Sequence, residues 1–518
     1  MSIKLNSFDY DLIEQYYVQN ILQNKFWLFC SHGNESEKPV SQNSDFDSKE
    51  VLEKLVFGAQ FNEQDVSFMI PFIQWEQGKI YTQYDDKGIL KDMPFYVVVE
   101  PEIESGNYHI FKCLSNNNAR PSENKPEFNP SIQYGLYNLD DGYVWKYMTS
   151  TTSTLFRKFS ARGLIPVLRN QQVESIADTG IYNIAVETEN SGYERITGTV
   201  DSIDTPSGTT KIFLRNLFSE TFRSTPIFDV PNFYSKRSIY IKKAFEAIEL
   251  RIRSSGVEDG LSFVVVSTPA NFTIERDNNI EILPRVEIVG NGQGATAIPI
   301  FDESNTRIVS VRMITYGDGY TNATARIVDP VSFDPSNENR QDIRCTIRLI
   351  LSPLGGHGSN VLIELNTKDL GLSKIINSFG QSEIPSSGSY SKIAIVKNPE
   401  FDTGFYGTTF DNRVQIELES LPANIQVSDS VTQDDVSGTV HQIDESTNTI
   451  FLINYEGPND GVFVSNKPIE FQGSTFQINN IEYSPYISLS GRVLAIADLT
   501  PVKRDEERSE QIKLILDF

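Results

Sequence analysis

The sequence predicts a mainly β protein, in which β-sandwich or barrel modules and a few α-helices form an elongated, multi-domain protomer. Short runs of β-branched and aromatic residues alternate with period two, between turns rich in Gly, Pro, Asn and Asp. The 518 residues exceed what one ordinary core holds. A hydrophobic content of 39%, with 11% aromatic residues, is enough to bury several cores.

Two helices are expected at the start of the chain. The first is predicted by apolar residues at helical spacing, namely Ile13, Tyr16, Tyr17 and Ile21. The second is predicted by Asp47-Ser48-Lys49-Glu50, which has the form of a capping box. It precedes an apolar stripe closed by a glycine, namely Val51, Leu52, Leu55, Val56 and Gly58.

From about residue 60 the period changes to two. Short strands are predicted at residues 68–71, around Trp75 to Tyr84, and at 95–99 and 108–114, followed by a polar loop at 116–130. The strand with the largest apolar load follows the Asp-Asp-Gly turn at 140–142 and carries Tyr143, Trp145 and Tyr147 on one face. Such aromatic alternation is typical of a core or an interface. We therefore predict that Trp75, Tyr143, Trp145 and Tyr147 are core or interface anchors.

Further along, a weak internal repeat appears. Gly-Thr-Val-x-x-Ile-Asp occurs at 198–204 and 438–444, and each copy leads to Ile-Phe-Leu, at 212–214 and 450–452. Each copy predicts a hairpin within a small inserted β barrel or sandwich. Between the copies, Ile241, Phe245, Ile248 and Ile252 at helical spacing predict one helix. A glycine-rich β module is expected at 286–328, and residues 511–518 alternate like a terminal strand.

These changes of pattern predict six segments. They are an N-terminal β core with two leading helices (1–165), a small hairpin module (166–235), a helix with the Gly-rich module (236–335), strands returning to the core (336–405), an inserted β module (406–485) and a C-terminal strand that completes the core (486–518).

The charge balance disfavours two classes of partner. With 69 acidic and 45 basic residues the formal net charge is −24, which repels nucleic acid and anionic lipid surfaces. No apolar run is long enough to span a bilayer, and the start of the chain lacks a secretory pattern, so folding in a cytoplasm is expected. Cys30, Cys113 and Cys345 lack zinc-ligand spacing and are expected to be buried free thiols.

No motif predicts a catalytic, cofactor or metal site. Gly290-Asn291-Gly292-Gln293-Gly294 fits neither nucleotide fingerprint, because no Gly-Lys-Ser/Thr and no helix follow it. His357 within Gly355-Gly356-His357-Gly358 indicates either a tight loop or an exposed imidazole site. Acidic pairs at 85–86, 140–141 and 434–435 are typical turn formers, although a glycosidase or a calcium site could use such pairs.

Five segments resemble, in order, the baseplate wedge subunit of contractile-tailed, T-even-type phages, the gene-product-eight family. The anchor segment at 139–148 resembles its Asp-Gly-Tyr-Val-Trp-x-Tyr-Leu signature. Met69-Ile70-Pro71, with Trp75 and Tyr81 to Tyr84, resembles its Ile-Pro-x-x-x-Trp segment, and 108–114 its Tyr-x-Cys-Leu strand. Residues 388–399 resemble its late Gly-Phe-x-x-Ile-x-Ile-x-x-Asn-Pro strand, and 510–518 its final strand ending in Phe.

The resemblance implies a structural virion protein rather than an enzyme, with extra β insertions relative to the family. It implies a homodimer that contacts other wedge subunits in the tail baseplate and rearranges when the host is attached, with no cofactor. The expected locations are the virion and, during assembly, the host cytoplasm. Two alternatives stay open: a tail adhesin that binds a cell-surface glycan through the inserted β modules, and a glycan-cleaving tail enzyme.

Overall fold

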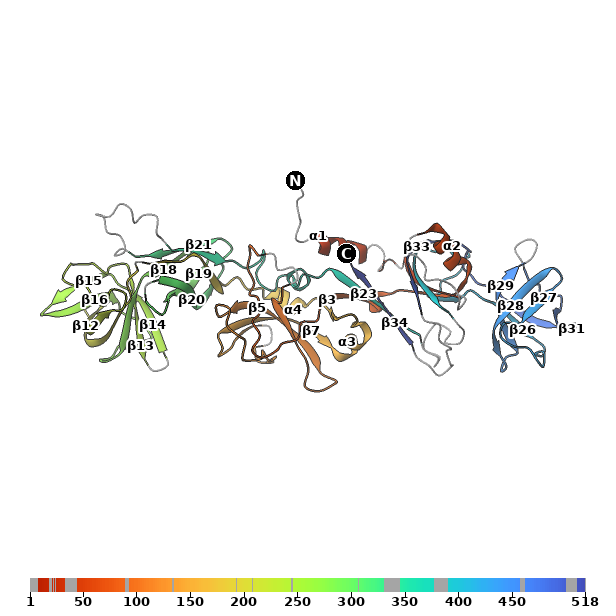
Figure 1. Cartoon of the computed structure of the whole chain (residues 1–518), viewed down its shortest axis with the longest axis horizontal. Helices are drawn as coiled ribbons and strands as arrows, with labels where there is room; N and C mark the ends of the chain where they lie inside the picture. The colour runs from red at the N-terminus through yellow and green to blue at the C-terminus, as the bar shows by residue number, and fades with distance from the viewer. Residues whose placement is uncertain are drawn as a thin grey trace. The chain divides into compact units, whose positions relative to one another are not determined.

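The structure is a computed structural model that describes residues 8–17, 21, 23, 25–32, 44–88, 93–132, 135–191, 193–206, 208–243, 246–305, 307–329, 345–376, 390–456, 462–499 and 510–517. Strands dominate it and the helices are short (Figure 1). Residues 1–71, 153–167 and 367–518 form a first compact unit, and residues 72–152 and 168–366 form a second. The prediction of a mainly β, multi-domain chain is therefore confirmed.

Two antiparallel sheets form the framework of the first unit. One has the order β25-β2-β1-β24-β33, with strands Thr409–Asp411, Leu55–Gln60, Phe26–Ser31, Lys392–Lys397 and Arg492–Asp498. The other has the order β34-β23-β3-β8, with strands Glu510–Asp517, Asp369–Ile376, Val66–Pro71 and Leu164–Val167. Phe26 of β1 shares a core with Leu370 of β23 and Ile512 of β34, so the sheets pack face to face. Trp27 belongs to a second core on the other face of β1.

The helices of the first unit are α1 (Phe8–Tyr16), α2 (Asp45–Glu53) and α3 (Ser153–Phe159), with a 3-10 turn, η2 (Glu63–Asp65). The first predicted helix is confirmed. The predicted capping box of the second is wrong, because the N-cap is Ser44, whose hydroxyl accepts the Asp47 N–H at 3.1 Å. Leu55 and Val56, expected in this helix, are buried in β2. There, pairing with β1 and burial outweigh their helical spacing.

The anchor strand lies in the second unit, in a sheet of order β4-β5-β7-β6. Its strands are Tyr96–Val99, Asn107–Asn116, Tyr143–Thr152 and Leu136–Asn138. The strand expected around Trp75, Tyr81 and Tyr84 is wrong, since that segment makes only isolated bridges, such as Gln74 with Val98. Its aromatic side chains are used for packing instead: the Tyr81 ring is buried with its centroid 5.6 Å from that of Trp145.

The Gly-rich segment of the second unit forms β strands as predicted. β18 (Arg285–Gly290) pairs with β21 (Ala323–Val328), and β19 (Gln293–Phe301) pairs with β20 (Arg307–Asp318). β20 continues a sheet of order β10-β20-β9-β22, with the other strands at Asn190–Ser191, Asn183–Thr188 and Thr346–Ile350. Short helices α4 (Gln171–Ser175) and α5 (Val361–Glu364) complete this part.

Residues 196–283 form a seven-stranded antiparallel sheet, which we call the first module. In sheet order β14-β13-β17-β11-β12-β16-β15 its strands are Glu246–Arg251, Ser238–Lys243, Asn279–Leu283, Ile196–Asp204, Thr209–Ser219, Leu261–Ser267 and Ser254–Glu258. Strands near both ends of this order contribute to one core, for example β13 through Ile241 and β16 through Val264. The sheet therefore curls around that core.

The helix predicted from Ile241, Phe245, Ile248 and Ile252 is wrong, because β13 and β14 pair as antiparallel strands there. Phe245 itself lies outside the described residues. Ile241 and Ile248 lie seven positions apart, which two helical turns would place on one face. In the hairpin they are direct cross-strand partners, so they also meet on one face of a sheet. The Ile-Tyr-Ile run at 239–241 favours the strand.

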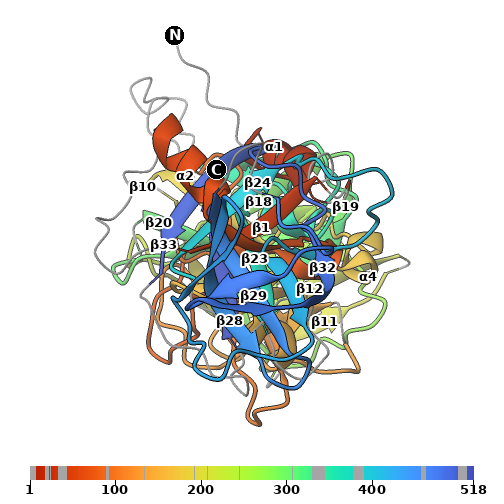
Figure 2. The same cartoon turned by 90° about the vertical axis from the view of Figure 1, so that its right-hand side faces the viewer.

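Residues 414–482 form another seven-stranded antiparallel sheet, the second module, drawn in blue in Figure 1. In sheet order β31-β30-β27-β28-β29-β26-β32 its strands are Ser474–Phe476, Ile469–Phe471, Ser430–Gln433, Val436–Asp444, Thr449–Glu456, Val414–Leu418 and Ile478–Glu482. The repeat at 438–444 lies in β28, which lies beside β29 (Figure 2). Both hairpins predicted from the repeat are confirmed.

The two repeat hairpins have the same register. Val200 pairs with Leu214 as Val440 pairs with Leu452, and both copies have irregularities at equivalent positions, after Thr197 and Val200 in β11 and after Ser437 and Val440 in β28. The neighbouring strands agree as well. Gly198 faces Ile280 across β11 and β17, as Gly438 faces Val431 across β28 and β27.

The agreement extends to the whole sheet. Across the two sheets, taken in the same direction, each strand of the second module has one equivalent in the first. The equivalent pairs are β31 and β14, β30 and β13, β27 and β17, β28 and β11, β29 and β12, β26 and β16, and β32 and β15. Along the chain, however, the second module begins with the equivalents of β16 and β17 and then continues with those of β11 to β15. The second module is therefore a circular permutation of the first.

The boundaries of the six predicted segments agree only in part with the observed modules and units. The predicted limit at residues 235 and 236 falls inside the first module, where β13 pairs with β17. The second module, 414–482, lies within the predicted segment 406–485. The predicted N-terminal segment 1–165 is divided, because residues 72–152 belong to the second unit.

Candidate functional site

The predicted aromatic anchors are packed inside the second unit. Tyr143, Trp145 and Tyr147 are 0%, 0% and 3% exposed, and the rings of Tyr143 and Trp145 stack with centroids 5.4 Å apart. Trp75 is half-buried and donates its indole N–H to Ser122 Oγ at 3.2 Å. Within the described part of the chain the Trp145 indole N–H has no acceptor. These side chains therefore form a packed support and leave little surface for a ligand.

The turn before the anchor strand fixes the neighbouring polar loop. Asp141 accepts the backbone N–H groups of Glu123 and Asn124 at 2.9 and 3.0 Å. Gly142 has a φ of +82°, and a Cβ there would lie 2.6 Å from Asn117 Nδ2. Tyr143 donates its hydroxyl hydrogen to the Arg120 carbonyl at 2.6 Å. Glycine is required at position 142, both for the backbone conformation and for the close approach of the loop.

His357, the residue singled out in the Gly-rich loop, belongs to a buried polar cluster. Its exposure is 2%, and its backbone exchanges hydrogen bonds with Asp178, N–H to O at 2.7 Å and O to N–H at 3.0 Å. Its Nδ1 lies 3.3 Å from Lys112 Nζ. Burial, with added repulsion from Lys112 and Lys146, holds the pKa of His357 well below its usual range. Of the two interpretations, the tight structural loop is the one observed.

The cluster contains a buried ion pair that joins residues 252 positions apart. Lys112 Nζ, with a fully buried side chain, lies 2.7 Å from Glu364 Oε2. Glu364 Oε1 accepts the N–H groups of Gly358 and Asn360 at 2.8 and 3.3 Å. The Lys112 ammonium also lies 4.1 Å from the centre of the Tyr84 ring. Burial lowers the pKa of Lys112, and the carboxylate of Glu364 opposes that shift.

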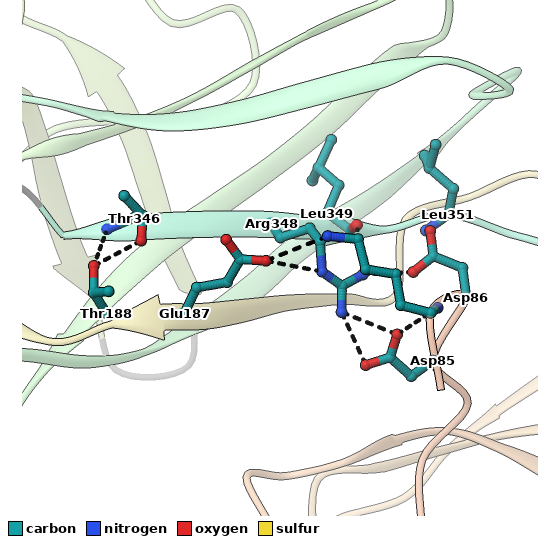
Figure 3. Close-up of polar contacts among 9 residues, drawn as sticks. Asp85, Asp86, Glu187, Thr188, Thr346, Arg348, Leu349 and Leu351 are labelled. Atoms are coloured by element: carbon teal, nitrogen blue, oxygen red, sulfur yellow. Dashed lines mark hydrogen bonds and ion pairs between the residues drawn. The ribbon is translucent and has the colours of Figure 1, made fainter. Parts of the chain in front are cut away.

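A second cluster in the same unit is centred on Arg348 of β22. Figure 3 shows its guanidinium directed at Asp85, Asp86 and Glu187. Arg348 donates to both carboxylate oxygens of Asp85 at 2.9 Å. Burial raises the pKa of Asp85, but the Lys87 N–H and Arg348 outweigh it and the net pKa is lowered. Arg348 therefore fastens the loop at 85–88 to the β9–β22 pair.

The other residues weighed for chemistry have structural contacts. Asp434 pairs with Lys467. Of the glycines at 290–294, Gly290 ends β18, Gly292 lies in the connection and Gly294 lies in β19. The three cysteines are buried free thiols, as predicted. Within the described ranges, no group of three or more His, Cys, Asp or Glu side chains could hold a metal ion. None of the described helices is long and apolar enough to cross a membrane.

One pocket lies where no residue was singled out from the sequence. It has a volume of about 340 Å³ and lies in the second module. Its lining residues are Phe463, Val464, Ser465, Asn466, Asn479, Asn480, Ile481 and Tyr483. The only sequence signal was the clustering of amides near an aromatic residue, which is common in loops. The buried pair of Lys112 and Glu364 gave no signal, because its members are so far apart in the chain.

The chain was also compared with known proteins. No family model matches it, and no curated protein matches it.

Proposed function

We propose that this chain is a non-enzymatic structural subunit of a contractile phage tail, a wedge subunit of the baseplate. The observation that carries the proposal is where the resembling segments lie. The segment at 69–71 lies in β3, and the segments at 388–399 and 510–518 contain β24 and β34, all strands of the two framework sheets of the first unit. Those at 108–114 and 143–147 are paired strands of one sheet in the second unit.

The two modules lie outside the framework sheets. Each module is a separate seven-stranded sheet with its own core, and each lies between framework strands in the sequence. This division is what a shared framework with added β insertions requires. The buried ion pair and the stacked aromatic rings described above give the second unit fixed surfaces, which suits a subunit that transmits force through its contacts.

The proposed partners are a second copy of the chain and other wedge subunits, with the assembled tail as the location. The test is an electron-microscopy map of tails purified from infected cells, together with sedimentation of the isolated chain. We expect density for the two framework sheets at the baseplate and a dimer in solution. A chain that is missing from purified tails and stays monomeric at high concentration would contradict the proposal.

A second candidate function is a tail adhesin that binds a glycan. The specific observation in its favour is the uncharged, amide-lined pocket of the second module.

A further inference from the structure

We propose that the pocket of the second module binds a neutral saccharide. This inference does not depend on the baseplate role; it deepens the second candidate function by naming the class of ligand and the residues that bind it. The pocket volume of about 340 Å³ lies at the small end of the range for ligand sites, roughly 300 to 1,000 Å³. A site of that size fits one or two sugar rings.

The chemistry of the lining selects the class of ligand. None of the eight lining residues is charged, although 22% of the chain is. An ionic ligand would therefore lack a counter-charge in the pocket. The polar groups are the amides of Asn466, Asn479 and Asn480 and the hydroxyl of Ser465. Amides donate and accept hydrogen bonds in one group, which matches ligand hydroxyls that also do both.

The pocket also offers an apolar surface. Tyr483 is 45% exposed and Val464 is 39% exposed, while Phe463 closes the pocket from the core at 1%. A flat aromatic face beside hydrogen-bonding amides fits a ligand with one apolar face and a hydroxyl-rich rim. Pyranose rings have this form.

Two side chains hold the pocket in a fixed shape. The buried Gln433 donates through Nε2 to the carbonyls of Val464 and Lys467 at 2.9 and 2.8 Å, and its Oε1 accepts the Val464 N–H at 2.7 Å. Tyr483 donates its hydroxyl hydrogen to the Phe463 carbonyl. One wall of the pocket is thereby ordered before a ligand arrives, which reduces the entropy lost on binding.

The first module has the same sheet but different residues at the positions equivalent to Gln433 and Ile481, so the fold does not require the residues that form the pocket. By strand register, the position of Gln433 in the second module corresponds to Ile282, a buried apolar residue, in the first. Ile481 corresponds to Ser255. In the first module the backbone of Asn232 and Tyr234 donates to Ser255 at 2.7 and 3.1 Å, so a loop lies against this strand. The second module instead has the pocket beside the equivalent strand.

The test measures saccharide binding by the full-length chain. Saturation-transfer NMR and calorimetry would use glucose, galactose, N-acetylglucosamine and their disaccharides, with N-acetylneuraminic acid and a sulfated disaccharide as charged probes. We expect at least one neutral sugar to bind at concentrations up to about 10 mM, as suits a small exposed site. No neutral sugar bound in that range, or binding of the charged probes alone, would overturn the proposal.

Variants locate the site. Asn480→Trp fills the pocket and is expected to weaken binding at least tenfold, whereas Ser254→Trp, at the equivalent position of the first module, should leave binding unchanged. Equal affinity in wild type and Asn480→Trp would overturn the assignment. Should Asn480→Trp fail to fold, Asn466→Ala removes one amide without adding bulk, and the expected loss is threefold or more. Unchanged affinity there would overturn it equally.

A further variant tests the positioning role of Gln433. Gln433→Ile introduces the residue of the first module, so the module should keep its fold. The loop at 464–467 loses its side-chain anchor and binding should weaken. Faster hydrogen exchange at Val464 with unchanged exchange in β28 and β29 would distinguish this positioning role from general destabilisation. Unaltered exchange at Val464 together with unaltered affinity would contradict it.

Discussion

Substituting Glu364 by Gln should destabilise the sheet that carries the anchor strand. The substitution keeps the shape of the side chain and one acceptor for the Gly358 N–H, but it removes the charge opposite Lys112. The ammonium of Lys112 then stays fully buried, 3.3 Å from His357 Nδ1. Because an uncompensated buried charge is unfavourable, the expected loss of stability is large.

The magnitude follows from the burial and from the pKa of a lysine. Removing one partner of a buried pair costs about 3–5 kcal/mol. An upper limit comes from the alternative open to Lys112, which is to lose its proton. Neutralising a group of ordinary pKa 10.4 at pH 7 costs about 5 kcal/mol, at 1.36 kcal/mol per pH unit. Lys112→Met should cost less, because Glu364 keeps the N–H groups of Gly358 and Asn360.

The assay is hydrogen exchange of the β5 and β7 amides, since a chain with several units need not unfold in one step. A loss of about 3–5 kcal/mol in the free energy of opening corresponds to exchange roughly 150-fold to 5,000-fold faster. The matched control is Glu174→Gln, which removes a charge from the partly exposed pair with Arg169 and should change exchange less than about fivefold. Equal effects of Glu364→Gln and Glu174→Gln would refute the reasoning.

Three further predictions concern the second unit. Burial holds the pKa of His357 well below 6.5 in the folded chain, so as the pH falls below about 6.5 the unfolded state binds a proton that the folded state does not. The free energy of unfolding therefore falls by up to about 1.4 kcal/mol per pH unit. In denaturant titrations at several pH values, His357→Asn should reduce this slope by about one proton, and an unchanged slope would refute the assignment. Gly142→Ala should lower the free energy of unfolding by about 1–3 kcal/mol in thermal melts, because strain and a close contact with Asn117 add together. The control Gly78→Ala, with φ +80° and nothing within 4 Å of its Cβ, should cost only about 1 kcal/mol in the same melts. Arg348→Lys loses the two-oxygen contact with Asp85 and should cost about 1 kcal/mol, seen as faster exchange at 85–88, with the effect shrinking in high salt because the carboxylates are partly exposed.

Local patterns predicted several β elements well. The anchor strand and both repeat hairpins follow from period-two alternation, which depends only on nearby residues. The alternation did not predict that the anchor strand is buried on both faces, with Val144 and Lys146 5% and 2% exposed. The false helix at 241–252 arose because Ile241 and Ile248 satisfy both a helical and a hairpin spacing. The sequence did not reveal that the modules are circular permutations of each other. Recognisable sequence similarity is confined to one hairpin of each module, and the remaining strands follow in a different order along the chain.

The sites were harder to predict for a related reason. The glycines around His357 indicated a tight loop, but its partners Lys112 and Glu364 lie far apart in the sequence and on different elements. Nothing local distinguishes a lysine that will be buried from one on the surface. The pocket likewise depends on Gln433, whose role appears only once β27 has been placed beside the loop at 464–467.

The permuted order of the two modules has a consequence for how such a chain can acquire an inserted domain. In the first module Ile196, where the chain enters, faces Ile282, where it leaves, and in the second Gln415 faces Glu482 in the same way. Entry and exit are thus neighbours in both, although they fall at different points of the sheet. A domain whose two ends meet can be spliced into a surface loop of a host protein without stretching it. Either splice point leaves every strand pairing intact, so this small β unit is portable.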